Sequence, residues 1–559
     1  MGNKKIKPTR RQFLKGFGAG AIGSQFLNFG LAPIFASAAH ASSSLGKTSD
    51  TKYIYFQHQG GPARYMFDAV FDPKGTGNLI PNPCVGSHFD SDGKIVYDTI
   101  SYQGTHIPYM WKSKIATSRS PQPVTMVRLL DHALILTGYT TATSSHELSS
   151  VRHLLWPNST GSLHGMIADQ SQTPIPIIDL SPGSWIGKWG YRSEKKTPKY
   201  DMSSVSSASL MAIFKPLLDL RSSGFANKFA TDKAFREVYY TLKSKHSRLG
   251  DAAKALFSAY DDFLSLLQND SIENADTEYL AIHKKYKSLL YKTVREVTFD
   301  GVSNRSIVSD GGDSGSNLFV INRDKVSLAA GYDLNHRKEE FSPSGSLISM
   351  MAMIEYLITK EITSVVVAGG SPGQFRMFTP TSNASPFSGA NTGSKDFGMG
   401  SDAHYYGGAF QLFANLHYYR LLVAGLYELT ETLKEKNLFN RSIIQVGGDF
   451  GRNPRTDGAG TDHDGNACST LILSGMFDKF NVFGNTIREH SDGNHVGTYG
   501  KGAVMESLGG ERLHVGHIMS SIATMAGVKS PRPNDRPILI KNEKMKKAFL
   551  RAKENKGLL

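Results

Sequence analysis

The residues best suited to chemistry lie in one glycine-rich stretch, residues 447–467. An apolar run delivers Asp449 to the start of this stretch, and Arg452 follows in the same turn. A second glycine-rich segment then presents the adjacent pair Asp462 and His463. Carboxylate oxygens and imidazole nitrogens suit a divalent metal ion, and an arginine suits an oxyanion. The stretch therefore predicts a site for a divalent ion, zinc or calcium, beside an anion contact.

Two further residues are candidates for the same site. Asp402 and His404 flank Ala403 just before a long predicted helix, where they would complete a set of metal ligands. A purely structural alternative stays open at this point. Asp449 would then cap a turn by bonding to the backbone two residues on, and Arg452 would be its partner.

Short runs of apolar residues indicate the strands that position these residues. Most runs are continuous rather than alternating, which is typical of strands covered on both faces by helices. Many end in glycine, and the carboxyl ends of parallel strands are where α/β proteins build their sites. The predicted strands are residues 53–57, 124–130, 133–137, 175–180, 364–368, 442–446 and 470–473.

One segment of the sequence predicts a βαβ unit. It runs from the strand at 364–368 through a helix at about 408–436 to the strand at 442–446. Residues 371–401, rich in Ser, Gly, Asn and Thr, indicate a long surface loop between the first strand and the helix.

Residues 204–297 differ from the rest of the chain. Apolar and aromatic residues recur there at helical spacing, with polar residues on the opposite face, which predicts a helical insertion or cap. The expected organisation is a first part of an α/β domain at 50–203, this insertion, and a second part at 298–545 that carries the site.

The N-terminal 41 residues are typical of a twin-arginine export signal. The basic stretch 9–15 reads TRRQFLK, a weakly apolar segment follows from 16 to 35, and two A-x-A cleavage sites follow it. A membrane anchor is the alternative, but the segment is rich in Gly and Ala and poorly apolar for a stable span. We therefore expect the twin-arginine translocase as an export partner and a periplasmic or secreted location.

Composition restricts the remaining choices. The formal charge of the chain is +14, and the chain without the signal is still mildly basic. This charge favours an anionic small-molecule or polymer substrate. No zinc-finger spacing occurs and the basic runs are short, so nucleic acid is not an expected partner. No second segment is long and apolar enough to predict a stable membrane span. Cys84 and Cys468 could form one disulfide, but two buried thiols are the favoured interpretation.

Four motifs resemble DUF1501, a family of secreted bacterial proteins of unknown function that is grouped with the alkaline phosphatase and sulfatase superfamily. The third motif below is the most specific, and the fourth is widespread in the superfamily. The motifs are Gly60-Gly61-Pro62 with Phe67-Asp68 and Phe71-Asp72-Pro73; Val127-Arg128 near His132, with His146 downstream; Asp449-Phe450-Gly451-Arg452 with Asp462-His463; and HIMSSIATMAGV at 517–528.

The resemblance implies a three-layer α/β/α sandwich of the alkaline phosphatase type, with a mainly parallel sheet and a helical insertion. It implies hydrolysis or transfer at phosphate or sulfate esters, with metal ions at the carboxyl ends of the strands. The residues it assigns are the metal ligands Asp449, Asp462, His463, Asp402 and His404 and the catalytic residues Arg452 and His146.

The sequence departs from the superfamily at two places, so two functions stay open. The first strand ends in Gln57-His58, where the superfamily carries an Asp, and no nucleophile motif stands out among the hydroxyl residues at 144–154. The first function is a metal-dependent hydrolase of anionic esters. The alternative is a non-catalytic descendant of the fold that binds a cell-envelope or extracellular polymer.

Overall fold

A computed structural model describes most of the predicted α/β domain. The residues it describes are 51–58, 63–69, 86–89, 95–156, 159, 161–171, 173, 176–180, 275–295, 341–369, 378–380, 408–454, 461–488 and 499–551.

The described residues form a mixed α/β structure around one seven-stranded sheet. Its order is β17-β8-β16-β13-β1-β11-β9, and every neighbouring pair is parallel except the two that involve β16. The prediction of a mainly parallel sheet in an α/β fold is therefore confirmed. The strands are β17 Asn481–Phe483, β8 Ala133–Tyr139, β16 Cys468–Leu473, β13 Ser442–Gly448, β1 Lys52–His58, β11 Val365–Gly369 and β9 Ile177–Leu180.

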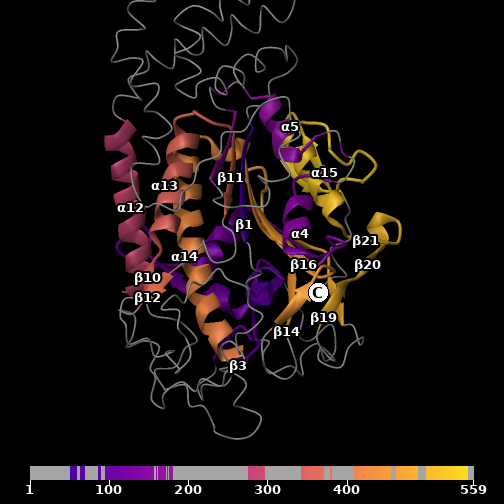
Figure 1. Cartoon of the computed structure of the whole chain (residues 1–559), viewed down its shortest axis with the longest axis horizontal. Coiled ribbons are helices and arrows are strands. Elements are labelled where there is room, and N and C mark those ends of the chain that lie inside the picture. Colours follow the sequence, from indigo (N-terminus) through magenta and orange to yellow (C-terminus); the bar gives the residue numbers. More distant parts are fainter. Residues whose placement is uncertain are drawn as a thin grey trace, which may run out of the picture.

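Helices pack on both faces of this sheet (Figure 1). The central strand β1 is buried along its whole length, with Ile54 and Phe56 in one core cluster and Tyr53 and Tyr55 in the other. Because side chains alternate between the faces of a strand, a strand covered on both faces must be apolar at successive positions. The helices on the first face are α12 Ala275–Arg295, α13 Gly345–Thr359 and α14 Gly408–Glu435, and those on the second are α5 Leu163–Asp169 and α15 Val515–Ala526.

Shorter elements surround the sheet. They include the helix α4 His146–Arg152 and the 3₁₀ helices η1 Arg64–Met66, η2 Tyr109–Lys112, η3 Met126–His132, η8 Phe439–Arg441 and η9 Glu506–Leu508. The antiparallel two-stranded pairs are β2 His88–Phe89 with β3 Ile95–Val96, β4 Thr99–Tyr102 with β5 Thr105–Pro108, β6 Lys114–Ile115 with β7 Val124–Thr125, β10 Phe341–Pro343 with β12 Phe378–Pro380, β14 Gly451–Pro454 with β15 Thr461–Asp464, β18 Thr486–Arg488 with β19 Tyr499–Gly502, β20 Val504–Met505 with β21 Glu511–Arg512, and β22 Leu539–Asn542 with β23 Lys547–Leu550.

One predicted strand is wrong. Residues 124–130 form only the two-residue strand β7 and then enter the 3₁₀ helix η3. The buried residues of η3 are Met126, Leu129 and Leu130, which recur at helical rather than alternating spacing. A short continuous apolar run does not distinguish the two cases by periodicity alone.

The predicted βαβ unit is present with one difference. β11 and β13 are parallel and are joined through α14, but β1 lies between them and pairs with both. Part of the predicted loop at 371–401 forms the strand β12, and the rest of it lies outside the described residues.

The C-terminal part of the predicted helical insertion is the helix α12. Its buried residues Tyr286, Leu289 and Leu290 belong to the core cluster that α13 and α14 share, so α12 extends the helical layer on that face. The other predicted helices, at 204–274, lie outside the described residues.

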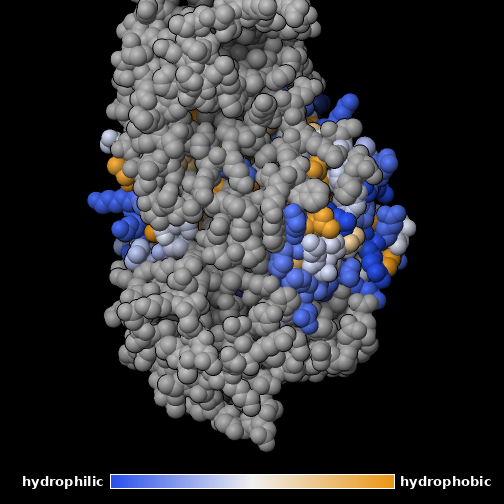
Figure 2. All heavy atoms as spheres, in the orientation of Figure 1, coloured by the Kyte–Doolittle hydropathy of each residue, from blue (hydrophilic) through white to orange (hydrophobic). Residues whose placement is uncertain are grey.

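The described surface visible in Figure 2 is largely hydrophilic, with small and separate apolar areas. Among the described residues, no helix combines the length and the apolar character that a membrane crossing requires.

The buried side chain of His164 in α5 makes the stability of the fold depend on pH. The side chain is fully buried, and burial lowers its pKa to about 3. Because the unfolded chain binds a proton near pH 6.5 and the folded chain does not, His164 withdraws stability as the pH falls below that value.

We therefore expect the free energy of unfolding to fall between pH 6 and pH 4 with a contribution from His164 of about 1.4 kcal/mol per pH unit. Urea unfolding at several pH values measures this slope. His164→Phe keeps a ring of similar size and should reduce the slope by that amount. An unchanged slope in the variant would show that His164 is protonated equally in both states.

Candidate functional site

Asp449 lies where the sequence predicts, directly after the carboxyl end of β13. Its side chain is buried, and its backbone N–H donates to the carbonyl of His58, the last residue of the neighbouring strand β1 (3.1 Å). The carboxylate Oδ1 accepts from the backbone N–H of Phe450 at 3.0 Å. Asp449 is therefore held rigidly at the edge of the sheet where the parallel strands end.

His146 meets Asp449 at this edge. β8 and β13 are both antiparallel to β16, so their carboxyl ends lie on the same side of the sheet, and His146 begins α4 shortly after β8. Its Nδ1–H donates to Asp449 Oδ2 at 2.5 Å. The His146 side chain is 16% exposed and that of Asp449 is 0% exposed. The buried carboxylate therefore orients the ring, and in the neutral tautomer this bond places the lone pair on Nε2.

His463 joins the pair from the β14–β15 hairpin. Its ring meets that of His146 edge to face, with 4.4 Å between centroids, and lies 4.1 Å from the ring of Phe450. Its Nδ1–H donates to the carbonyl of Ser144 at 2.8 Å, because a carbonyl oxygen only accepts. The lone pair of the neutral His463 ring is therefore also on Nε2.

A close backbone contact holds the hairpin against the segment that follows β8. A Cβ at Gly465 would lie 2.3 Å from the carbonyl oxygen of Thr143, so only glycine allows this approach. The N–H of Thr141 donates to the Gly465 carbonyl at 2.9 Å. This contact keeps His463 beside the segment that carries His146.

The two histidines of this cluster have the outer hydrogen bonds of zinc-binding histidines, but they do not belong to a group of three converging ligands among the described residues. In proteins a metal-binding histidine usually donates its other ring N–H to a carboxylate or a backbone carbonyl, and His146 and His463 each make one of these two bonds. Asp449 fits the outer position, because its two oxygens accept from His146 and from the Phe450 N–H. Imidazole ligands favour zinc over calcium, which prefers oxygen ligands.

The other predicted ligands have different positions. In the β14–β15 hairpin, Arg452 is opposite His463 and Asn453 is opposite Asp462. Successive residues of a strand point to opposite faces, so the side chains of Asp462 and His463 leave the hairpin on different faces. Asp402 and His404 lie outside the described residues.

Arg452 is completely buried. Its guanidinium lies 5.2 Å from the centroid of the Phe450 ring, in a cation–π contact. The same ring contacts His463, so Arg452 stabilises the aromatic cluster of the site.

His58 and Asp68 entered the sequence analysis only within family motifs, and the two buried features that they form at this edge were not predicted. His58 ends β1, and its Nδ1 is hydrogen-bonded to the Tyr418 hydroxyl of α14. Burial, and then the nearby Arg64 charge, lower the pKa of His58 well below its usual value, so this ring stays neutral. The only signal in the sequence was a histidine at a predicted strand end.

The second missed feature is a buried ion pair. Arg64 and Asp68 lie one turn apart after β1, form a salt bridge, and are 1% and 0% exposed. The Arg64 guanidinium also donates to the carbonyls of Val446 (3.2 Å) and Ser469 (3.1 Å), and the Ser469 hydroxyl donates to Asp68 (2.6 Å). The pair therefore ties the segment after β1 to β13 and β16.

Cys468 is a buried free cysteine, as the favoured interpretation expected. Burial raises the pKa of its thiol to about 12, so the thiol does not supply a nucleophilic thiolate near neutral pH. Cys84 lies outside the described residues.

Comparison with known families agrees with the motif that the sequence analysis singled out. Residues 417–489 match the family described as a protein of unknown function, DUF1501. The matched span includes Asp449, Arg452, Asp462 and His463, and it supports the resemblance to this family. No curated protein is significantly similar to this chain.

Proposed function

We propose that this protein is an exported, metal-dependent hydrolase of phosphate or sulfate esters, built on an α/β/α sandwich of the alkaline phosphatase type. The observation that carries the proposal is the contact between His146 and His463. Both rings donate Nδ1–H to an oxygen, so both carry their lone pair on Nε2, and both lie at the carboxyl edge of the sheet.

The fold supports the proposal at a coarse level. A mostly parallel sheet with helices on both faces is the frame that such an enzyme requires, and the cluster lies where the strands β8 and β13 end.

The residues of the site have separate tasks in this proposal. His146 and His463 would hold the ion through Nε2, and Asp449 fixes the ring of His146. When bound, the ion supplies Lewis-acid chemistry at the ester oxygen and activates the attacking group. The backbone bonds of Asp449 and the close approach at Gly465 keep the two rings together without rearrangement.

One observation favours the non-catalytic alternative. The end of β1 carries His58, hydrogen-bonded to Tyr418, where an alkaline phosphatase-like enzyme has a carboxylate ligand. A polymer-binding protein of the same fold would not need that ligand.

Turnover of aryl phosphate and aryl sulfate by protein from the periplasmic fraction distinguishes the two functions. We expect the wild type to hydrolyse one of these esters, to lose activity with a chelator and to regain it with zinc. His463→Ala should lose the activity because it removes a ligand nitrogen. His106→Ala is the matched control, since this half-buried histidine of β5 lies outside the site.

Each result has a clear meaning when folding is matched by circular dichroism. Equal turnover in His463→Ala and His106→Ala would contradict the metal site. A wild type without metal and without turnover on either ester would favour the polymer-binding alternative. Protein found only in the cytoplasm would contradict export.

A further inference from the structure

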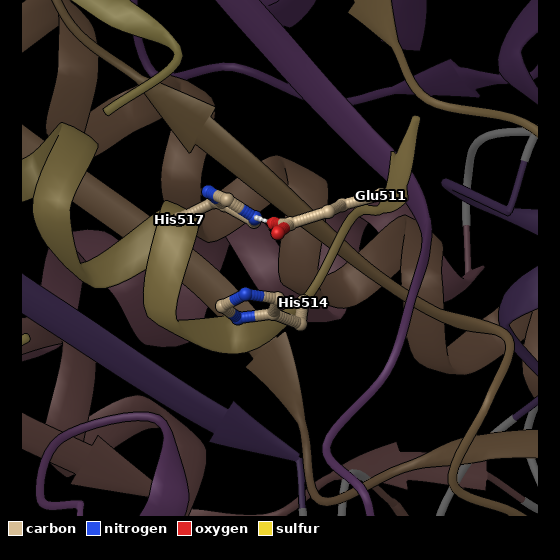
Figure 3. A group of neighbouring side chains, drawn as sticks. All are labelled: Glu511, His514 and His517. Atoms are coloured by element: carbon tan, nitrogen blue, oxygen red, sulfur yellow. Dashed lines mark ion pairs between the residues drawn. The ribbon is translucent and has the colours of Figure 1, made fainter. Parts of the chain in front are cut away.

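Three side chains able to bind a metal converge at the start of α15 (Figure 3). Glu511 lies on β21, His514 directly precedes α15, and His517 is in its first turn. One ligand atom from each lies within 4.8 Å of the others, which no other group of three or more such side chains achieves among the described residues. We propose that Glu511, His514 and His517 bind a zinc ion, at a second site that is independent of the proposed function.

His517 is the residue that points to a ligand. Its side chain is 3% exposed, and its Nδ1–H donates to the backbone carbonyl of Arg536 at 2.9 Å. This bond fixes the tautomer with the lone pair on Nε2 and is the usual outer contact of a zinc-binding histidine. His517 Nε2 is buried and has no hydrogen-bond partner. A buried nitrogen of this kind is costly unless something binds it.

Glu511 faces that nitrogen. Figure 3 shows its carboxylate directed at the His517 ring, with Oε2 3.8 Å from Nε2. Ligands around a tetrahedral zinc ion are about 3.3 Å apart, given metal–ligand distances of about 2.0–2.1 Å. Because the Glu511 side chain is exposed, a small movement would shorten the 3.8 Å separation to the distance that two zinc ligands require. The open side of the site admits a water molecule as fourth ligand.

His514 completes the set but must exchange one hydrogen bond. Its ring lies 3.9 Å from that of His517, and its Nδ1 accepts from the backbone N–H of Gly516, which caps the helix. Binding through Nδ1 displaces that cap, and binding through Nε2 requires the tautomer with a proton on Nδ1, so the cap is lost in either case. The positive end of the helix dipole also opposes a cation, and the nearby Asp535 is already paired with Arg532 at 2.5 Å, so the negative charge of Glu511 is needed to offset it.

An ion here would fasten β21 to α15 next to the first site. The Thr140 N–H donates to the Leu513 carbonyl and the Val515 N–H donates to the Thr140 carbonyl, both at 3.0 Å. Thr140 directly follows β8 and leads to His146. The second site, which we call the zinc clip, therefore braces the segment that carries a ligand of the first.

Zinc binding to chelator-stripped, full-length protein tests the clip, with a competing chromophoric chelator as the readout. We expect Glu511→Gln to lose one zinc equivalent, or to bind it at least about 100-fold more weakly, since the loss of an outer contact alone weakens metal binding 10–100-fold. Glu506→Gln is the matched control, because it removes the same charge from an exposed glutamate of η9. Zinc should also raise the Tm of the control more than that of Glu511→Gln.

His463→Ala separates the two sites. We expect this variant to keep the equivalent that Glu511→Gln loses. Equal zinc binding and equal Tm shifts in Glu511→Gln and Glu506→Gln would overturn the clip. A loss of zinc only in His463→Ala would overturn the zinc clip and support the first metal site. A loss of zinc only in Glu511→Gln would support the clip and contradict the first metal site.

Discussion

Arg64→Met is expected to lower the free energy of unfolding by about 3–5 kcal/mol. The methionine fills much of the space but leaves the Asp68 carboxylate buried without its ion-pair partner. The Ser469 hydroxyl still donates to this carboxylate. The carbonyls of Val446 and Ser469 each lose one donor as well, while the Thr470 and Tyr139 hydroxyls still donate to them. An uncompensated buried charge is one of the few single changes with an effect of this size.

The double variant Arg64→Met, Asp68→Leu is the control for this result. It removes both charges, and the replacement of a whole buried ion pair by apolar residues is often neutral. We expect it to recover most of the lost stability in urea or thermal unfolding. A loss below about 1 kcal/mol in Arg64→Met, the size typical of an exposed pair, would contradict the burial of this ion pair.

Asp449→Ala should have the largest effect on the site among residues that do not bind the ion themselves. The His146 ring would lose the acceptor that fixes its orientation and tautomer, so we expect metal affinity or activity to fall about 10–100-fold. Zinc titration into stripped protein measures the affinity, and ester turnover measures the activity.

Two variants sharpen this comparison. Asp449→Asn keeps an oxygen that accepts from His146 but removes the charge, so it should fall between the wild type and Asp449→Ala. Asp131→Ala removes a half-buried carboxylate that accepts from Tyr102, away from the site, and should bind zinc like the wild type. Unchanged zinc affinity in Asp449→Ala would show that His146 needs no positioning.

The strands of the sheet could be predicted because they are buried on both faces. Residues 53–57, 364–368 and 442–446 are continuous apolar runs, and they lie in the central strands β1, β11 and β13. The run at 124–130 is also mostly apolar but contains Arg128, and its burial follows a 3₁₀ helix. The position of β1 between β11 and β13 depends on contacts between residues far apart in sequence, which local patterns do not encode.

The site was predictable in part for the same reason. Asp449 follows a central strand, so its place at the sheet edge follows from strand polarity, whereas its bond to His146 spans 303 positions. The adjacency of Asp462 and His463 suggested two ligands of one ion, but a strand sends neighbouring side chains to opposite faces. Glu511 and His514 escaped notice because they precede α15, on β21 and at the helix N-cap, so no single predicted element linked them to His517.

Anomalous diffraction at the zinc absorption edge, from crystals of the protein grown with zinc, tests the central claim most directly. We expect a peak about 2.0–2.1 Å from Nε2 of both His146 and His463, with Asp449 still bonded to Nδ1 of His146. Fully occupied zinc elsewhere, with no peak between these two nitrogens, would contradict it.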